Sequence, residues 1–166
     1  MAAPDVRVRI TGLRELEANL LDLADEYGPR NAISSLRAPM RAALVPFREQ
    51  VIANTPVDTG VLRESVRLQI RQPNRMRDRG PHTDVTRNIL VGLVGWSWSS
   101  EMNLWNQALA IEFGNRVTVA QPVLRPLLDS LGEAAINNFA EDAARSIERT
   151  ARRLGRRRAA GNLRRI

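Results

Sequence analysis

The stretch TPVDTGVLRESV, residues 55–66, marks the point at which the hydrophobic period of the chain changes. Before it, apolar residues recur every three or four positions, which is the period of an amphipathic helix. After it, Val66, Leu68 and Ile70 alternate with arginine and glutamine, as in a half-buried strand. The sequence therefore predicts helices in the first third of the chain and a sheet directly after them. A shorter alternating run at residues 6–10 allows one further strand.

The triplet Asp58-Thr59-Gly60 inside this stretch has two interpretations. It is the signature of aspartic proteases, in which two carboxylates share a proton. Such an enzyme is nearly all β and places its triplet after an apolar strand, whereas helical segments precede the triplet here. A capped turn fits better, because Asp58 can accept amide hydrogen bonds, Gly60 can take a positive φ and Leu62 can anchor the turn. We therefore expect a structural role for Asp58 and no enzyme activity.

Two helical segments are expected before this turn. The first, residues 13–27, has a one-sided apolar stripe and is followed by the stop signal Gly28-Pro29. The second follows directly and also has one apolar face, but it contains Pro39 and Pro46. Proline lacks the amide hydrogen and clashes with the preceding turn, so we expect a kinked or broken helix there.

The rest of the chain predicts a small sheet and more helix. Residues 66–70 and 88–98 are β-type runs that can pair as antiparallel neighbours, with a long polar loop at 71–87 between them. A short helical segment is expected at 102–113 and a long one at about 121–154. The expected fold class is α+β, with two N-terminal helical segments and a long C-terminal helix packed on a small antiparallel β-sheet.

Positive charge is concentrated near the C-terminus. All 25 basic residues are arginine, and nine of them lie from residue 145 onward with a single acidic residue. Apolar residues and arginines occupy opposite sides of the helix expected up to Leu154. We expect one α+β domain over 1–154 and an Arg-rich flexible tail over 155–166. The arginines of this end either keep it soluble or contact DNA or an acidic partner: Arg145, Arg149, Arg152, Arg153, Arg156, Arg157, Arg158, Arg164 and Arg165.

Residues that could carry out chemistry are few. The chain has no cysteine, which excludes thiol catalysis, disulfides and cysteine-based metal sites. Its single histidine, His82, lies in the polar loop without metal-ligating partners, so no metal or cofactor is expected. No apolar run reaches the length of a signal peptide or a membrane span, so we expect a soluble protein with no membrane partner.

Four further residues are candidates for subunit contacts. Glu112 is either an intersubunit ion-pair partner of Arg63 or Arg125, or an ordinary surface acid. Aromatic residues are enriched both in cores and in interfaces. Three tryptophans are therefore possible interface residues: Trp96, Trp98 and Trp105.

Three blocks of sequence carry a resemblance to a known family. The stretch at 55–66, then ALAIEFGN at 108–115, then AQPVLRPLLD at 120–129 follow two helical segments in that order. Together they resemble the gene-product-10-like tail-component family of long-tailed bacteriophages, although Asn115 stands where threonine is usual. The matching residues are Pro56, Asp58, Thr59, Gly60, Leu62, Arg63, Ser65, Glu112, Phe113, Gly114, Gln121, Pro122, Arg125 and Pro126.

The resemblance covers roughly residues 13–147 and implies a structural virion protein. It implies a tail completion or tail terminator subunit that forms a ring, usually a hexamer, where the tail tube meets the head connector. The implied partners are further copies of the chain, the neighbouring head-connector and tail-tube proteins, and DNA in the lumen. Such a protein is assembled in the host bacterial cytoplasm. The arginine-rich end alone allows an alternative, a free-standing nucleic-acid-binding protein.

Overall fold

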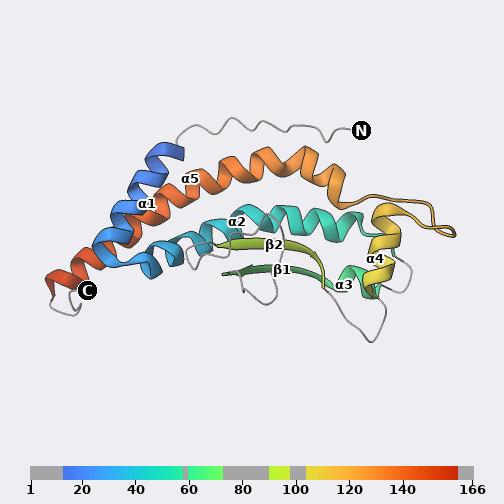
Figure 1. The fold of residues 1–166 in the computed structure, drawn as a ribbon, viewed down its shortest axis with the longest axis horizontal. Helices are drawn as coiled ribbons and strands as arrows, with labels where there is room; N and C mark the ends of the chain where they lie inside the picture. Colours follow the sequence, from blue (N-terminus) through green and yellow to red (C-terminus); the bar gives the residue numbers. More distant parts are fainter. Residues whose placement is uncertain (1–12, 58–59, 73–89, 98–103, 161–166) are drawn as a thin grey trace.

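The computed structural model describes residues 13–57, 60–72, 90–97 and 104–160. The class is α+β, as predicted, with a two-stranded sheet and a long C-terminal helix. The elements in chain order are α1 (Leu13–Tyr27), α2 (Pro29–Asn54), α3 (Val61–Glu64), β1 (Val66–Arg71), β2 (Val91–Trp96), α4 (Leu104–Phe113) and α5 (Leu124–Ala159). Figure 1 shows α2 lying between α5 on one side and the sheet on the other.

Helix α2 is continuous over 26 residues, so of the two expected outcomes, a kink or a break at Pro39 and Pro46, the break is wrong. Each proline removes one backbone hydrogen bond from the helix. The helix is nevertheless packed against α5 on one side and against both strands on the other. Pro39 itself is buried, as are Ile33 and Val51 on the same helix. Tertiary packing on both sides thus outweighs the local cost of the two prolines.

The two strands pair antiparallel, as predicted, with Val66 opposite Trp96 and Ile70 opposite Gly92. One face of the sheet packs on α2. On this face Val66, Val94 and Trp96 join the cluster that also contains Val51 of α2. A Cβ atom added to Gly92 would lie 2.5 Å from Leu44 Cδ1 of α2. The glycine therefore marks a close approach of strand and helix.

The hydrophobic core of the described residues is divided into three clusters that follow one another along the molecule. The first lies where α1, α2 and the C-terminal half of α5 meet, and it contains Leu23, Tyr27 and Ile147. The second joins α2, the sheet and the start of α5 around Val51 and Leu127. The third is small and holds α3 against α4 through Leu62, Leu104 and Ala108. Helices α2 and α5 connect the first cluster to the second.

Helix α5 extends beyond its expected end and runs through Gly155 to Ala159. The prediction of a flexible tail from residue 155 is therefore wrong for its first five residues. Leu154 is buried in the first cluster. The Arg158 guanidinium contacts the Glu26 carboxylate at 3.2 Å and lies over the Tyr27 ring. These contacts, and the favourable interaction of arginines with the C-terminal end of the helix dipole, continue the helix.

Several predictions fall on residues outside the described part of the chain. They concern the strand at 6–10, most of the loop at 71–87, and six individual residues. Those residues are Asp58, Thr59, His82, Trp98, Arg164 and Arg165.

We expect Gly92→Val to destabilise the fold by about 1–3 kcal/mol, because the added side chain overpacks the contact with Leu44 and Met40. Gly95→Val is the matched control. Gly95 lies on the same strand, and a Cβ atom there would meet nothing within 4 Å. Chemical denaturation measures both changes in the free energy of unfolding. Equal effects of the two substitutions would contradict the close packing of β2 on α2.

Candidate functional site

The three sequence blocks lie together at one end of the molecule, where α3 and α4 meet and α5 begins (Figure 1). The first block forms the connection from α2 to β1 through α3. The second forms the end of α4, and the third forms the start of α5. Residues far apart in the sequence therefore form one structural unit.

In the first block, Arg63 ties α3 to the end of α2. Its Nη2 donates hydrogen bonds to the carbonyl oxygens of Thr55 at 3.1 Å and Ala53 at 3.4 Å. The C-terminal carbonyls of a helix lack partners within the helix, so a cation placed there satisfies them and interacts with the helix dipole. Its buried Nε has no acceptor among the described residues. Arg63 thus fixes the chain reversal between helix and strand.

Thr55 is the buried centre of this reversal. Its hydroxyl donates to the Val51 carbonyl at 2.6 Å and accepts from Trp96 Nε1 at 3.2 Å. Trp96 is half-buried and packs on two of the three core clusters. The tryptophan therefore holds β2 to the end of α2, and as a core contact it fits one of the two predicted roles.

The turn before α3 has the predicted backbone. Gly60 precedes the helix with φ at +82°, in the left-handed region. Leu62 is buried and anchors the turn in the third cluster. Ser65 is also buried and donates its hydroxyl to the Leu62 carbonyl at 2.7 Å. These three family-like residues are structural.

The second and third blocks are joined by the carboxylate of Glu112. One oxygen, Oε2, accepts the backbone N–H groups of Val123 at 2.8 Å and Leu124 at 3.0 Å. The other, Oε1, accepts the backbone N–H of Arg125 at 3.2 Å. Pro126, the next residue, has no N–H to offer. A single side chain from α4 therefore satisfies every backbone donor from Val123 to Pro126 at the start of α5.

Arg125 reinforces this cap from the outside. Its Nε donates to Glu112 Oε1 at 3.2 Å, and its Nη2 donates to the Glu112 backbone carbonyl at 2.7 Å. The same guanidinium lies over the Phe113 ring, 4.8 Å from the centroid. The ion pair is therefore within one chain, with Arg125 and not Arg63.

Glu112 is a buried cap, so the interpretation as a surface acid is wrong, and the ion pair that it forms with Arg125 lies within the chain. One signal in the sequence could have indicated this. Helix α5 begins after Gln121, Pro122 and Val123, none of which is a serine, threonine, aspartate or asparagine that could cap it. A long helix without a local cap requires an acceptor from elsewhere in the chain.

Burial of Glu112 acts to raise its pKa, but the backbone N–H groups of Leu124, Val123 and Arg125 and the Arg125 side chain favour the carboxylate. The pKa therefore lies below its ordinary value. The pKa of the Glu112 carboxyl is higher in the unfolded chain than in the folded one. The carboxylate therefore stabilises the folded state fully at pH values above the pKa of the unfolded chain. This stabilisation is lost as the pH falls through the lower pKa of the folded state.

A tight loop connects α4 to α5 and projects from the surface. Gly114 begins it with φ at +75°, where an added Cβ would lie 3.0 Å from the Ala120 nitrogen. Asn115 Oδ1 accepts the N–H groups of Val117 at 2.8 Å and Thr118 at 2.6 Å. The Asn115 N–H donates to the Thr118 carbonyl at 2.9 Å. Asn115 thus builds the turn, an arrangement that was not predicted from the sequence.

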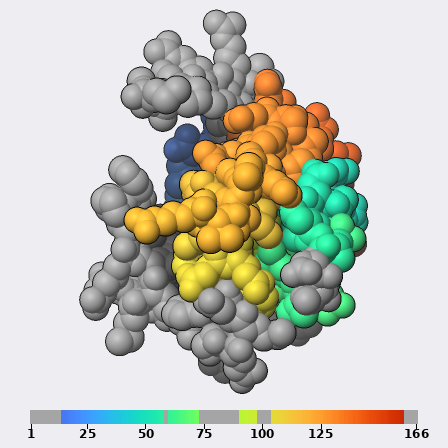
Figure 2. Space-filling model, turned by 90° about the vertical axis from the view of Figure 1, so that its right-hand side faces the viewer, coloured from blue at the N-terminus to red at the C-terminus, as the bar shows by residue number. Residues whose placement is uncertain are grey.

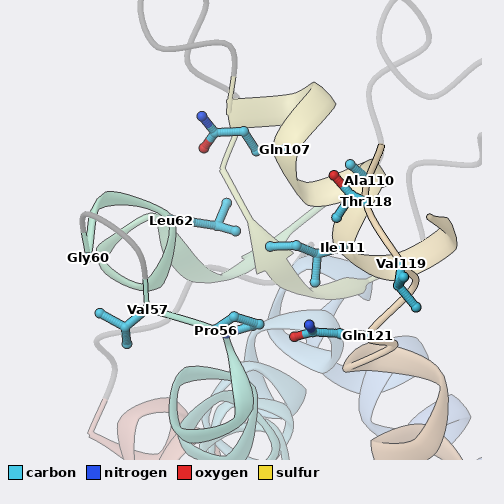
Figure 3. Close-up of a pocket in the computed structure, with 10 residues that line it drawn as sticks. All are labelled: Pro56, Val57, Gly60, Leu62, Gln107, Ala110, Ile111, Thr118, Val119 and Gln121. Atoms are coloured by element: carbon cyan, nitrogen blue, oxygen red, sulfur yellow. The ribbon is translucent and has the colours of Figure 1, made fainter. Parts of the chain in front are cut away.

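An open cavity of about 370 Å³ lies between this loop, α4 and the turn before α3 (Figure 3). Pro56, Leu62, Ile111 and Gln121 line it together with six other uncharged residues. In the described part of the chain, no group of three or more His, Cys, Asp or Glu side chains could hold a metal ion. None of the described helices is long and apolar enough to cross a membrane.

Exposed apolar side chains are concentrated at this end. Those with the largest exposed fractions are Val117 at 94% and Val119 at 82%, both in the loop. Trp105 is also exposed, and its role in an interface stays a prediction. The others near this end are Val57, Leu109, Phe113 and Leu128.

The predicted arginine face of α5 lies toward the opposite end of the molecule, and part of it is neutralised. Arg145 contacts the Asp142 carboxylate at 3.1 Å, and Arg152 contacts that of Glu148 at 2.7 Å. Arg149 donates to a backbone carbonyl of the same helix. The arginines that are exposed and have no ion pair among the described residues include Arg153, Arg156 and Arg157.

We expect Glu112→Gln to lower the free energy of unfolding by about 1–3 kcal/mol at neutral pH, because an amide cannot accept all of these hydrogen bonds. The variant should also lose less stability than the natural protein between about pH 5 and pH 3, since it lacks the titrating group. Denaturation at several pH values measures both effects, with the exposed Glu17→Gln of α1 as the control. Identical pH dependence of variant and natural protein would show that the carboxylate is not the cap.

A comparison with protein-family models finds no family that matches the chain. Comparisons with curated proteins and with solved structures likewise find no significant match.

Proposed function

We propose that the protein is a structural subunit of a tailed-bacteriophage neck, a ring-forming tail completion or tail terminator protein that joins the tail tube to the head connector. The proposal rests on one observation. The three sequence blocks that resemble the phage tail-component family lie together at one end of the fold. Glu112 of the second block caps the helix that begins in the third, and the turn of the first block packs on α4 beside them.

The character of this end supports a role in assembly. A structured loop that exposes two valines almost completely is unfavourable in water unless another surface covers it. The cavity beside the loop has no charged residue in its lining. In this proposal the ring, a hexamer, is held by subunit contacts at this end, and DNA passes through its lumen. The protein belongs to the virion and is assembled in the cytoplasm of the host.

The exposed arginines near the C-terminal end of α5, here called the arginine end, support a second contact with another molecule. Arg156 and Arg157 lie three and four residues after Arg153 on α5, and all three arginines are exposed. In the neck proposal they meet an acidic surface of a neighbouring head or tail protein, or the DNA. The same observation favours the second candidate function, a free-standing nucleic-acid-binding protein.

We expect the purified protein, or necks isolated from virions, to contain closed rings with a central hole. Negative-stain imaging and mass photometry detect cyclic multiples of the 18.6 kDa chain. Addition of the protein to heads and tails made without it should restore joining. A protein that stays monomeric both in solution and on tail ends, and that shifts DNA on a gel, would replace the neck function by the second candidate.

We expect the triple substitution of Arg153, Arg156 and Arg157 by glutamine to reduce the joining of heads to tails severalfold and to make the remaining joining less sensitive to salt. Exposed charges are screened over about 10 Å at 0.1 M salt, so the natural protein should lose activity as salt rises. Substitution tests this better than deletion of residues 155–166, because α5 continues to Ala159. Arg145→Gln, which removes an arginine paired with Asp142, is the control. Unchanged joining by the triple variant at every salt concentration would limit these arginines to a solubilising role.

A further inference from the structure

The loop between α4 and α5, residues 114–120 and here named the finger, is ordered by its own hydrogen bonds. Three bonds involving Asn115 close its turn, and the Gln121 N–H donates to the Ile111 carbonyl at its base at 2.8 Å. Figure 2 shows this golden segment projecting from the end of the molecule. Val117 and Val119 are the most exposed large apolar residues in the described part of the chain. The finger is therefore a preformed apolar projection.

A complementary apolar groove lies between α2, β2 and the first turns of α5. It consists of two adjoining cavities of about 400 and 200 Å³ that share Leu44, Gly92, Ala135 and Ile136 in their linings. Leu128 stands at the rim, 62% exposed. The groove is open, and its lining is predominantly apolar.

The unpaired charges around the two surfaces are opposite, because the one arginine that lines the groove, Arg125, is already paired with Glu112. Arg116 lies in the finger next to Val117 and is exposed. Asp129 and Glu133 of α5 are exposed beside the groove-lining residues Leu128 and Gly132. None of these three charged side chains forms an ion pair with another described residue. A finger placed in a groove thus brings an unpaired cation toward two unpaired carboxylates.

We propose that the finger of one subunit enters the groove of the next, with Val117 and Val119 against the apolar lining and Arg116 near Asp129 and Glu133. The occupant is a second copy of this chain, because the exposed valines show that the finger does not fill the groove of its own chain. A contact between two different surfaces of identical subunits is head-to-tail, and it closes into a ring when the rotation between subunits allows. This inference rests on the proposed function and identifies the contact that builds the ring.

Cysteine cross-linking tests the contact directly, because the natural chain contains no cysteine. Full-length Val117→Cys and Leu128→Cys are prepared separately, mixed and oxidised. A disulfide-linked dimer is expected from the mixture in much higher yield than from either variant alone. A chain carrying both substitutions should give a ladder of covalent multimers that ends at the ring number. Leu21→Cys, an exposed position on α1, replaces Leu128→Cys in the control and should give no specific product with Val117→Cys.

A charge exchange provides the second measurement. Arg116→Glu should weaken assembly about tenfold, since like charges then face each other across the contact. Adding Asp129→Arg and Glu133→Arg to the same chain should restore assembly. Because Arg116, Asp129 and Glu133 all lie at the surface, denaturation can check that these variants fold like the natural protein.

The outcomes separate this inference from the proposed function. If the natural protein forms rings but residues 117 and 128 do not cross-link and the charge exchange has no effect, the finger-and-groove contact is wrong and the neck function stands. If Val117→Cys couples instead to a head or tail protein, the occupant is not a second copy, and the inference is also overturned. If the natural protein forms no rings in solution or on tails, the proposed function fails together with the inference.

Discussion

The arrangement of the candidate site depends on one buried carboxylate. Glu112 accepts the three backbone N–H groups that begin α5, a helix of 36 residues without a capping side chain of its own. Without this acceptor the start of α5 would leave buried or half-buried donors unsatisfied, which is costly away from water. The same bonds fix where α4 ends and where the finger returns to the body. The position of the groove follows as well, since its α5 wall begins at Leu124.

The sequence predicted those features that depend on local pattern. The helix α1 and its stop at Gly28, the pairing of the two strands, and the positive φ of Gly60 all follow from residue type and period. Helix α2 was expected to kink or break at its prolines, because nothing local shows that a helix will be packed against α5 on one side and strands on the other. The extension of α5 past Leu154 was missed for the same reason, since Tyr27 and Glu26, which contact Arg158, are far away in the sequence.

The candidate site was predictable as a set of residues but not as an arrangement. Family-like motifs identified Glu112, Arg125 and Arg63 as important, yet the pattern alone could not distinguish a contact within the chain from one between chains. The structure assigns each a partner: Glu112 binds the start of α5, Arg125 binds Glu112, and Arg63 binds the end of α2. All three form their contacts within the chain. The surface left for other molecules consists instead of apolar residues such as Val117 and Val119, which no motif contains.

The length of α5 has a mechanical consequence. Its 36 residues form one continuous, curved helix with a length of roughly 54 Å along its axis, because each residue of an α-helix advances the chain by about 1.5 Å (Figure 1). The finger end and the arginine end are attached to the two ends of this helix, while separate core clusters hold it along its length. If the protein rotated about the finger, the arginines at the far end of α5 would therefore move over a larger distance than the residues near the finger. A small change of angle at one contact would move the opposite surface by a much larger distance without any internal rearrangement.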